Sequence, residues 1–167
     1  MQSRINLAEV VKLSQKVYDR RPSLANIVVA LGGMYWTNAT YLIYFGPCDM
    51  PEQQFNLASL DMKNGLGGYP VLDKIVSNIY KAKKLDQHII NNEVWYVNPD
   101  TMFGFDPEIV KQVTRLCNIK ADANFNEVYV SESGMAMKIF LGEPLLAKTP
   151  YIIISPKRIP SSPSASV

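Results

Sequence analysis

The chain has 167 residues, of which 47% are hydrophobic and 19% are charged. These totals exclude a disordered protein and fit one globular domain with a core of its own. The net charge of +2 excludes a polycation, so any binding to nucleic acid must come from local placement of charge. We find no secretory signal and no apolar run near the ~20 residues that span a bilayer, and so expect no membrane partner and a cytoplasmic location.

The N-terminal segment is predicted to form an amphipathic helix over Asn6–Arg20. Asn6 is a favourable N-cap residue, and Glu9 completes a capping-box pattern three positions later. Apolar residues recur at helical spacing along one face, with Ser14 as its weak member. On another face, basic residues recur every four positions: Lys12, Lys16 and Arg20.

Strands are predicted to follow this helix. Leu24–Leu31 is rich in β-branched residues, and Gly32–Gly33 is a hairpin turn signal before the aromatic run Met34–Phe45, which Asn38 interrupts. Gln54–Leu60 is a further predicted strand. The first half therefore reads as a helix followed by an antiparallel meander.

The middle of the chain is less regular. The glycine-rich turn Asn64–Gly68 matches no nucleotide-binding fingerprint. Val71–Lys84 has apolar residues at helical spacing and a lysine-rich end, so we expect a helix there. His88–Val97 is predicted to be one strand, and Asn98–Asp100 a turn.

The C-terminal part repeats the order of helix and then strands. Asp106 is a favourable N-cap residue and Pro107 a favourable first residue of the next helix, which places Lys111 and Arg115 on its outer face. A Ser/Pro-rich stretch, 160–167, is predicted to be a disordered tail. Three strands are predicted between this helix and the tail: Glu127–Val130, Met135–Leu141 and Tyr151–Ile154, which is wholly apolar and suits a central strand.

No catalytic or metal-binding constellation is evident. His88 is the only histidine, Cys48 and Cys117 are far apart, and the 15 acidic residues are scattered. We therefore expect no catalytic residue, no metal and no cofactor, and predict that the protein is not an enzyme. A small enzyme of an unrelated α+β fold would rest on His88 and scattered carboxylates alone.

Charge is segregated along the chain. Residues 1–21 carry five basic and two acidic side chains, and residues 73–84 carry four basic and one. A basic stripe on a helix can contact phosphates without reading bases. The same stripe also fits an ordinary solvated helix face.

The stretch FDPEIVKQVTRLCN, the strands after it and the ending YIIISPKRI resemble the last half-domain of bacterial DNA polymerase III β subunits, the sliding clamps. Phe105, Asp106 and Pro107 match the family's helix entry, and Glu143–Leu145 resembles its strand break. The terminal signature is matched by Pro156, Arg158 and Ile159. Similarity in the N-terminal half is weaker.

This resemblance implies an α+β, DNA-clamp-like fold of two βαβββ half-units with helices on one face of antiparallel sheets. The expected single domain spans 1–159, with half-units at roughly 1–62 and 101–159 and a variable middle. In that family the helices line a ring around duplex DNA, and the end of the chain contributes to a partner-peptide pocket. The corresponding DNA-binding residues here are Lys12, Lys16, Arg20, Lys111, Arg115 and Lys120, and the partner-binding residues are Pro156, Arg158 and Ile159.

Three departures shape the expected function. The chain has room for one clamp domain where a bacterial subunit has three, so a ring would need about six copies. Ser155 and Lys157 stand where the family has methionines, and the middle, from about Gly65 to Asp100, differs in length. We expect a divergent or phage-type processivity factor that contacts the phosphates of duplex DNA as a homo-oligomer and works with a polymerase or another replication protein. The alternative is a clamp-fold inhibitor or adaptor that binds protein without encircling DNA.

Overall fold

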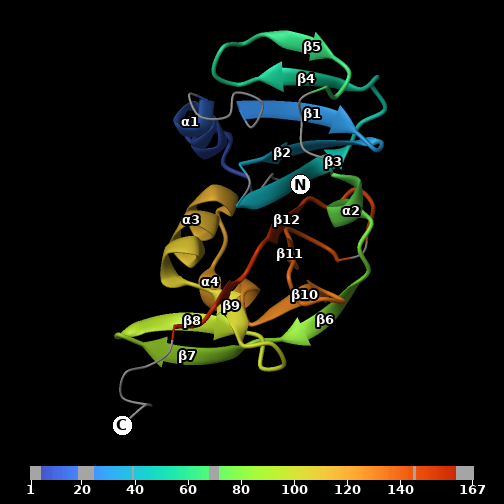
Figure 1. Cartoon of the computed structure of the whole chain (residues 1–167). Coiled ribbons are helices and arrows are strands. Elements are labelled where there is room, and N and C mark those ends of the chain that lie inside the picture. Colours follow the sequence, from blue (N-terminus) through green and yellow to red (C-terminus); the bar gives the residue numbers. More distant parts are fainter. Residues whose placement is uncertain (1–4, 19–24, 39, 68–71, 145, 161–167) are drawn as a thin grey trace.

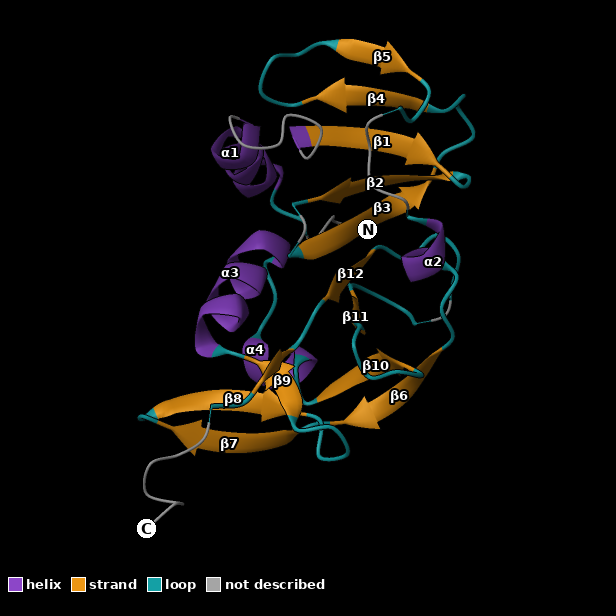
Figure 2. Cartoon of the chain, in the orientation of Figure 1, coloured by secondary structure: helices purple, strands orange, loops and turns teal. Residues whose placement is uncertain are grey.

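The computed structural model describes residues 5–18, 25–38, 40–67, 72–144 and 146–160 (Figures 1 and 2). The protein is an α+β structure in which all strand pairings among these residues are antiparallel. The helices are α1 (Leu7–Tyr18), α2 (Asp73–Val76), α3 (Pro107–Cys117) and α4 (Ala121–Asn124). The strands are β1 (Asn26–Ala30), β2 (Gly33–Thr37), β3 (Tyr41–Pro47), β4 (Gln53–Asn56), β5 (Met62–Asn64), β6 (Tyr80–Lys84), β7 (Asp86–Ile90), β8 (Glu93–Val97), β9 (Phe103–Phe105), β10 (Glu127–Ser131), β11 (Met137–Phe140), β12 (Tyr151–Ile154) and β13 (Lys157–Arg158).

The strands form one large and one small sheet. The larger has nine strands in the order β5-β4-β1-β2-β3-β12-β11-β10-β6, and the smaller has four in the order β13-β9-β8-β7. In the larger sheet, β1–β3 and β10–β12 run in mirrored order and meet where β3 pairs with β12. The predicted Tyr151–Ile154 strand is therefore flanked on both sides, and its four residues are buried.

Each strand triplet follows a helix. α1 precedes β1–β3, while α3 and the short α4 precede β10–β12. β9 comes before α3, so the second group has the order βαβββ. Before α1, the described residues Ile5 and Asn6 form no strand. The backbone N–H of Asn6 donates to the Leu116 carbonyl at 2.7 Å, joining the start of α1 to the end of α3.

Helices lie on both sides of the larger sheet. α1 and α3 are on the left in Figure 1 and α2 is on the right. The main core lies on the α1 and α3 side; the fully buried Phe125 packs there against the rings of Tyr96 and Phe105 at 5.5 and 5.1 Å. Leu72 and Val76, from the α2 region, instead pack in a second, smaller core on the other face of the sheet, with Leu42 and Ile153. The expectation that all helices share one face is therefore wrong for α2.

An aromatic row crosses the α2 side of the larger sheet. Its ring centroids lie 4.8 to 6.0 Å apart from one strand to the next, a spacing that favours tilted and edge-to-face contacts. The row contains, in spatial order, Tyr35, Tyr44, Tyr151, Phe140 and Tyr129. It ties both strand triplets together on this face.

Several predicted boundaries are confirmed. Asp106 caps α3, accepting a hydrogen bond from the Ile109 N–H at 2.7 Å, and Pro107 opens that helix. The first hairpin turn lies one residue earlier than predicted, at Leu31 and Gly32, whose φ values are 52° and 74°. Gly33 opens β2 instead, where a Cβ would lie 2.6 Å from the Tyr44 ring.

The middle of the chain corrects the sequence predictions most. The expected helix over Val71–Lys84 is wrong: α2 covers Asp73–Val76 alone, and Tyr80–Lys84 is a strand that pairs with β10. The expected strand His88–Val97 is two strands, because Asn91 and Asn92 turn the chain with φ values of 54° and 64°.

Two further boundaries differ near the first triplet. The expected strand Gln54–Leu60 ends at Asn56, whose side-chain oxygen accepts the N–H groups of Ala58 and Ser59 and turns the chain. The chain then returns as β5, which was not predicted. The predicted tail from 161 onward lies outside the described residues.

Replacing Phe125 with alanine should lower the free energy of unfolding by about 3–5 kcal/mol, because it opens a cavity between the two sheets. Urea unfolding followed by circular dichroism measures this. Leu60→Ala is the control, since 68% of Leu60 is exposed. Equal destabilisation by both variants would contradict the assigned core.

Candidate functional site

The outer face of α1 carries two of the predicted phosphate contacts. Lys12 and Lys16 are exposed, whereas Val10 and Ser14 are fully buried on the inner face. Ser14 fits there because its hydroxyl donates to the Val10 carbonyl at 2.8 Å, so the polar group is satisfied. Arg20 lies outside the described residues.

The outer face of α3 has the same character. Lys111 and Arg115 are exposed, and Ile109 and Val113 are buried beneath them. Glu108 is also exposed at the start of the helix, so this surface carries mixed charge. Lys120, which precedes α4, is exposed as well.

The structure brings these two helices together. The hydrogen bond from Asn6 to Leu116 fixes the start of α1 against the end of α3, and both helices lie on one side of the molecule (Figure 1). The exposed basic residues that were predicted therefore come from two neighbouring helices that are far apart in sequence. A basic surface of this kind can neutralise phosphate groups without base-specific contacts.

The C-terminal signature forms the edge of the small sheet. Pro156 is buried, Arg158 is exposed and Ile159 is partly buried. The guanidinium of Arg158 lies 5.7 Å from the ring centroid of Phe103, and Ile159 donates its N–H to the Met102 carbonyl at 3.2 Å. These three residues therefore do not form one exposed surface.

Lys157 has a partner that the sequence did not suggest. Its ammonium lies 3.1 Å from the carboxylate of Asp106, the residue that caps α3. Asp106 is 14% exposed and Lys157 is 63% exposed. One carboxylate thus caps the first turn of α3 and holds strand β13 against that turn.

A shallow groove lies in the middle of the larger sheet, where the start of β3 pairs with the end of β12. We call it the Ser155 groove. Its volume is about 250 Å³. Hydroxyl groups and the partly exposed side chains of Ile75 and Met135 give it a mixed polar and apolar lining. Its lining includes Thr37, Thr40, Ile75, Ser131, Met135 and Ser155. The sequence held no local signal for this groove, because its walls come from four separate segments of the chain.

Two unusual titratable groups have structural explanations. Lys138 lies over the rings of Tyr80 and Tyr151, at 4.2 and 4.3 Å from their centroids, and burial lowers its pKa. Burial raises the pKa of the Cys117 thiol to about 12, so this thiol is an inert part of the core.

The described part of the chain holds no cluster of three or more His, Cys, Asp or Glu side chains that could hold a metal ion. His88 is partly buried on β7, opposite Trp95 of β8. Among the described residues no helix has the length and apolar character needed to cross a membrane.

Comparison of the chain with protein-family models, with curated proteins and with solved structures found no match.

Asp106→Ala should lower stability by about 1 kcal/mol through loss of the cap, whereas Asp106→Asn should keep most of it, because an asparagine side chain also accepts from a helix N–H. Lys157→Met should cost less than Asp106→Ala, since an exposed ion pair contributes about 0–1 kcal/mol. Thermal unfolding of the three variants measures the order. A Lys157→Met variant less stable than Asp106→Ala would contradict it.

Proposed function

We propose that the protein is a non-enzymatic, DNA-clamp-like factor that self-associates and binds the phosphate backbone of duplex DNA, supporting the processivity of a polymerase. The observation that carries this proposal is the pair of neighbouring helices, α1 and α3, with exposed basic residues on both. Each helix precedes three antiparallel strands, and the two groups meet through their third strands. This arrangement accords with two clamp half-units in one domain.

Charge favours a backbone contact over base recognition. Lys12 and Lys16 on α1 and Lys111 and Arg115 on α3 are exposed, and none takes part in an ion pair among the described residues. Each phosphate contact releases condensed counterions, so affinity should fall steeply as salt rises. The exposed Glu108 at the start of α3 lowers the positive charge of that surface and weakens its attraction for phosphate.

Self-association is supported by the size of the domain. One domain is too small to surround a duplex, so encirclement requires several copies.

Simultaneous replacement of Lys12, Lys16, Lys111 and Arg115 by alanine should abolish binding to duplex DNA, because these changes remove the proposed phosphate contacts. Fluorescence anisotropy with a labelled duplex, repeated over a salt series, measures affinity and counterion release. A matched control replaces four exposed lysines elsewhere: Lys63, Lys74, Lys84 and Lys148. Equal losses of DNA affinity in both variants would mean that binding depends on the net charge of the protein. That result would contradict a DNA-binding face on α1 and α3.

The second candidate is a clamp-fold inhibitor or adaptor that binds protein and does not encircle DNA. The Ser155 groove favours it, because Met135 and Ile75 expose apolar surface beside hydroxyl groups next to the C-terminal signature. Such a groove suits an extended peptide.

Met135→Glu should weaken the binding of such a partner by placing a charge in the groove. It should not unfold the protein, because 49% of Met135 is already exposed. The measurement is recovery of partners by wild type and variant from cells in which the protein occurs. Met50→Glu, which changes a similarly exposed methionine outside the groove, is the control. Equal recovery by all three proteins would exclude the groove as the docking site.

A further inference from the structure

The strand β6 ends the nine-stranded sheet, at the place where the sequence predicted a helix. It pairs with β10 along one edge, and its other edge faces away from the sheet (Figure 1). The free edge of a strand presents backbone donors and acceptors to which an extended chain can add.

The register identifies which backbone groups face outward. Leu85 donates its N–H to the Asn126 carbonyl at 2.7 Å, and these residues are opposite each other one step beyond the pair Lys84–Glu127. In an antiparallel ladder, hydrogen-bonded and non-hydrogen-bonded pairs alternate. Lys81 and Lys83 therefore bond to β10, and the backbone groups of Ala82, between them, point to the free edge.

A pocket of about 430 Å³ lies beside this strand. Ile79, Lys81, Ala82 and Lys83 line it from the β6 segment, and Val130, Ser131 and Glu132 line it from the β10 segment. Ile79 is 71% exposed, a large apolar side chain with no cover at the start of the strand. The pocket thus offers apolar surface next to open backbone groups.

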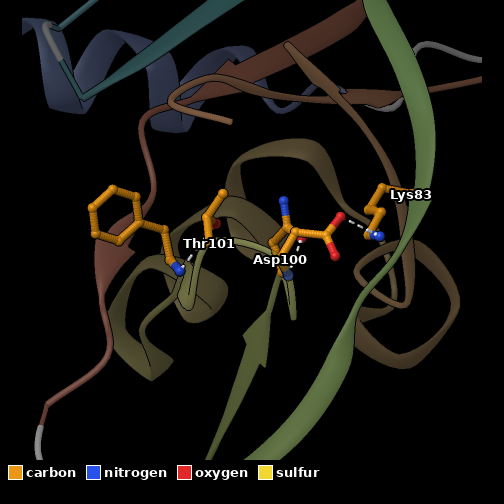
Figure 3. Close-up of polar contacts among 5 residues, drawn as sticks. Lys83, Asp100 and Thr101 are labelled. Atoms are coloured by element: carbon orange, nitrogen blue, oxygen red, sulfur yellow. Dashed lines mark hydrogen bonds and ion pairs between the residues drawn. The ribbon is translucent and has the colours of Figure 1, made fainter. Parts of the chain in front are cut away.

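Lysine side chains dominate the charge of β6 itself. Lys83 is neutralised by Asp100, whose carboxylate lies 2.6 Å from its ammonium (Figure 3). Lys81 and Lys84 are exposed and belong to neither ion pair found in the described part of the chain. The strand contains no acidic residue, so its available charge is positive.

We propose that β6 is a docking edge for an extended, acidic segment of a partner protein, which adds to the sheet as a further strand. Backbone groups of that segment bond to the outward groups of Ala82. A carboxylate pairs with Lys81, and an apolar side chain covers Ile79 two positions away on the same face. The inference goes beyond the proposed DNA contact and does not depend on it.

The surroundings of β6 favour this partner over two others. Asp100 and Glu132 also line the pocket. A phosphate chain carries a charge on every unit and would meet Glu132, whereas a peptide can place one carboxylate against Lys81 and uncharged side chains beside Glu132. Pairing with β5 of a second copy would bring Lys63 to the lysines of β6, and β5 offers no acidic residue in return. An acidic peptide can pair with the charge of Lys81 and also bond to the outward backbone groups of Ala82.

The test uses a fluorescein-labelled peptide of about ten residues that repeats Val-Thr-Glu-Thr, so that valine and glutamate alternate on one face of the added strand. It is titrated with the whole protein. Ala82→Pro removes the outward N–H without removing a bond to β10, since proline is tolerated on strand edges. Ala82→Val is its matched control, because it keeps that N–H. We expect binding by wild type and by Ala82→Val, a loss of about tenfold or more with Ala82→Pro, and a similar loss with Lys81→Glu.

Two altered peptides complete the experiment. A version N-methylated at alternate residues, and one with lysine in place of glutamate, should both fail to bind wild type. If Ala82→Pro does not fold, as judged by circular dichroism, the N-methylated peptide tests the edge on the unaltered protein. Absence of peptide binding to wild type, undiminished binding of the N-methylated peptide, or displacement of the peptide by duplex DNA would overturn the proposal.

Discussion

The pairing of β12 with β3 is the constraint on which the rest of the structure depends. It joins segments over 100 residues apart into one sheet, and all four residues of β12 are buried. Ile152 and Ile154 face the main core, while Tyr151 and Ile153 face the core on the other side. Without this strand the two triplets would be separate sheets, and the helices that precede them would have no common support.

The two faces of the larger sheet differ in what they present. On one face α1 and α3 cover the main core and turn their basic residues outward. The other face carries the aromatic row, with Lys138 held over two of its rings. The candidate DNA surface and the Ser155 groove therefore depend on the same strand pairing but are built from different segments.

Sequence patterns predicted elements whose signals are local. The cap at Asp106, the proline after it and the alternation of buried and exposed residues along α3 all lie within a few positions of one another. The helix predicted over Val71–Lys84 was wrong. The apolar spacing of this segment suits a helix, but pairing with β10 makes Tyr80–Lys84 a strand. Tertiary contacts decided that choice. Asn91–Asn92 did carry a local turn signal, since asparagine tolerates positive φ, but the long apolar run around it concealed the hairpin.

The candidate site shows the same division. The exposed lysines of α1 and α3 follow from helix periodicity, and five of the six predicted phosphate contacts are exposed, with Arg20 outside the described residues. The ion pair between Asp106 and Lys157 and the Ser155 groove depend on segments that only the fold brings together. No spacing rule in the sequence could have indicated them.

Native mass spectrometry of the protein, with and without duplex DNA, tests the central claim most directly. The account predicts a closed homo-oligomer that retains one duplex per assembly. A stable monomer at micromolar concentration that gains no mass with DNA would contradict it.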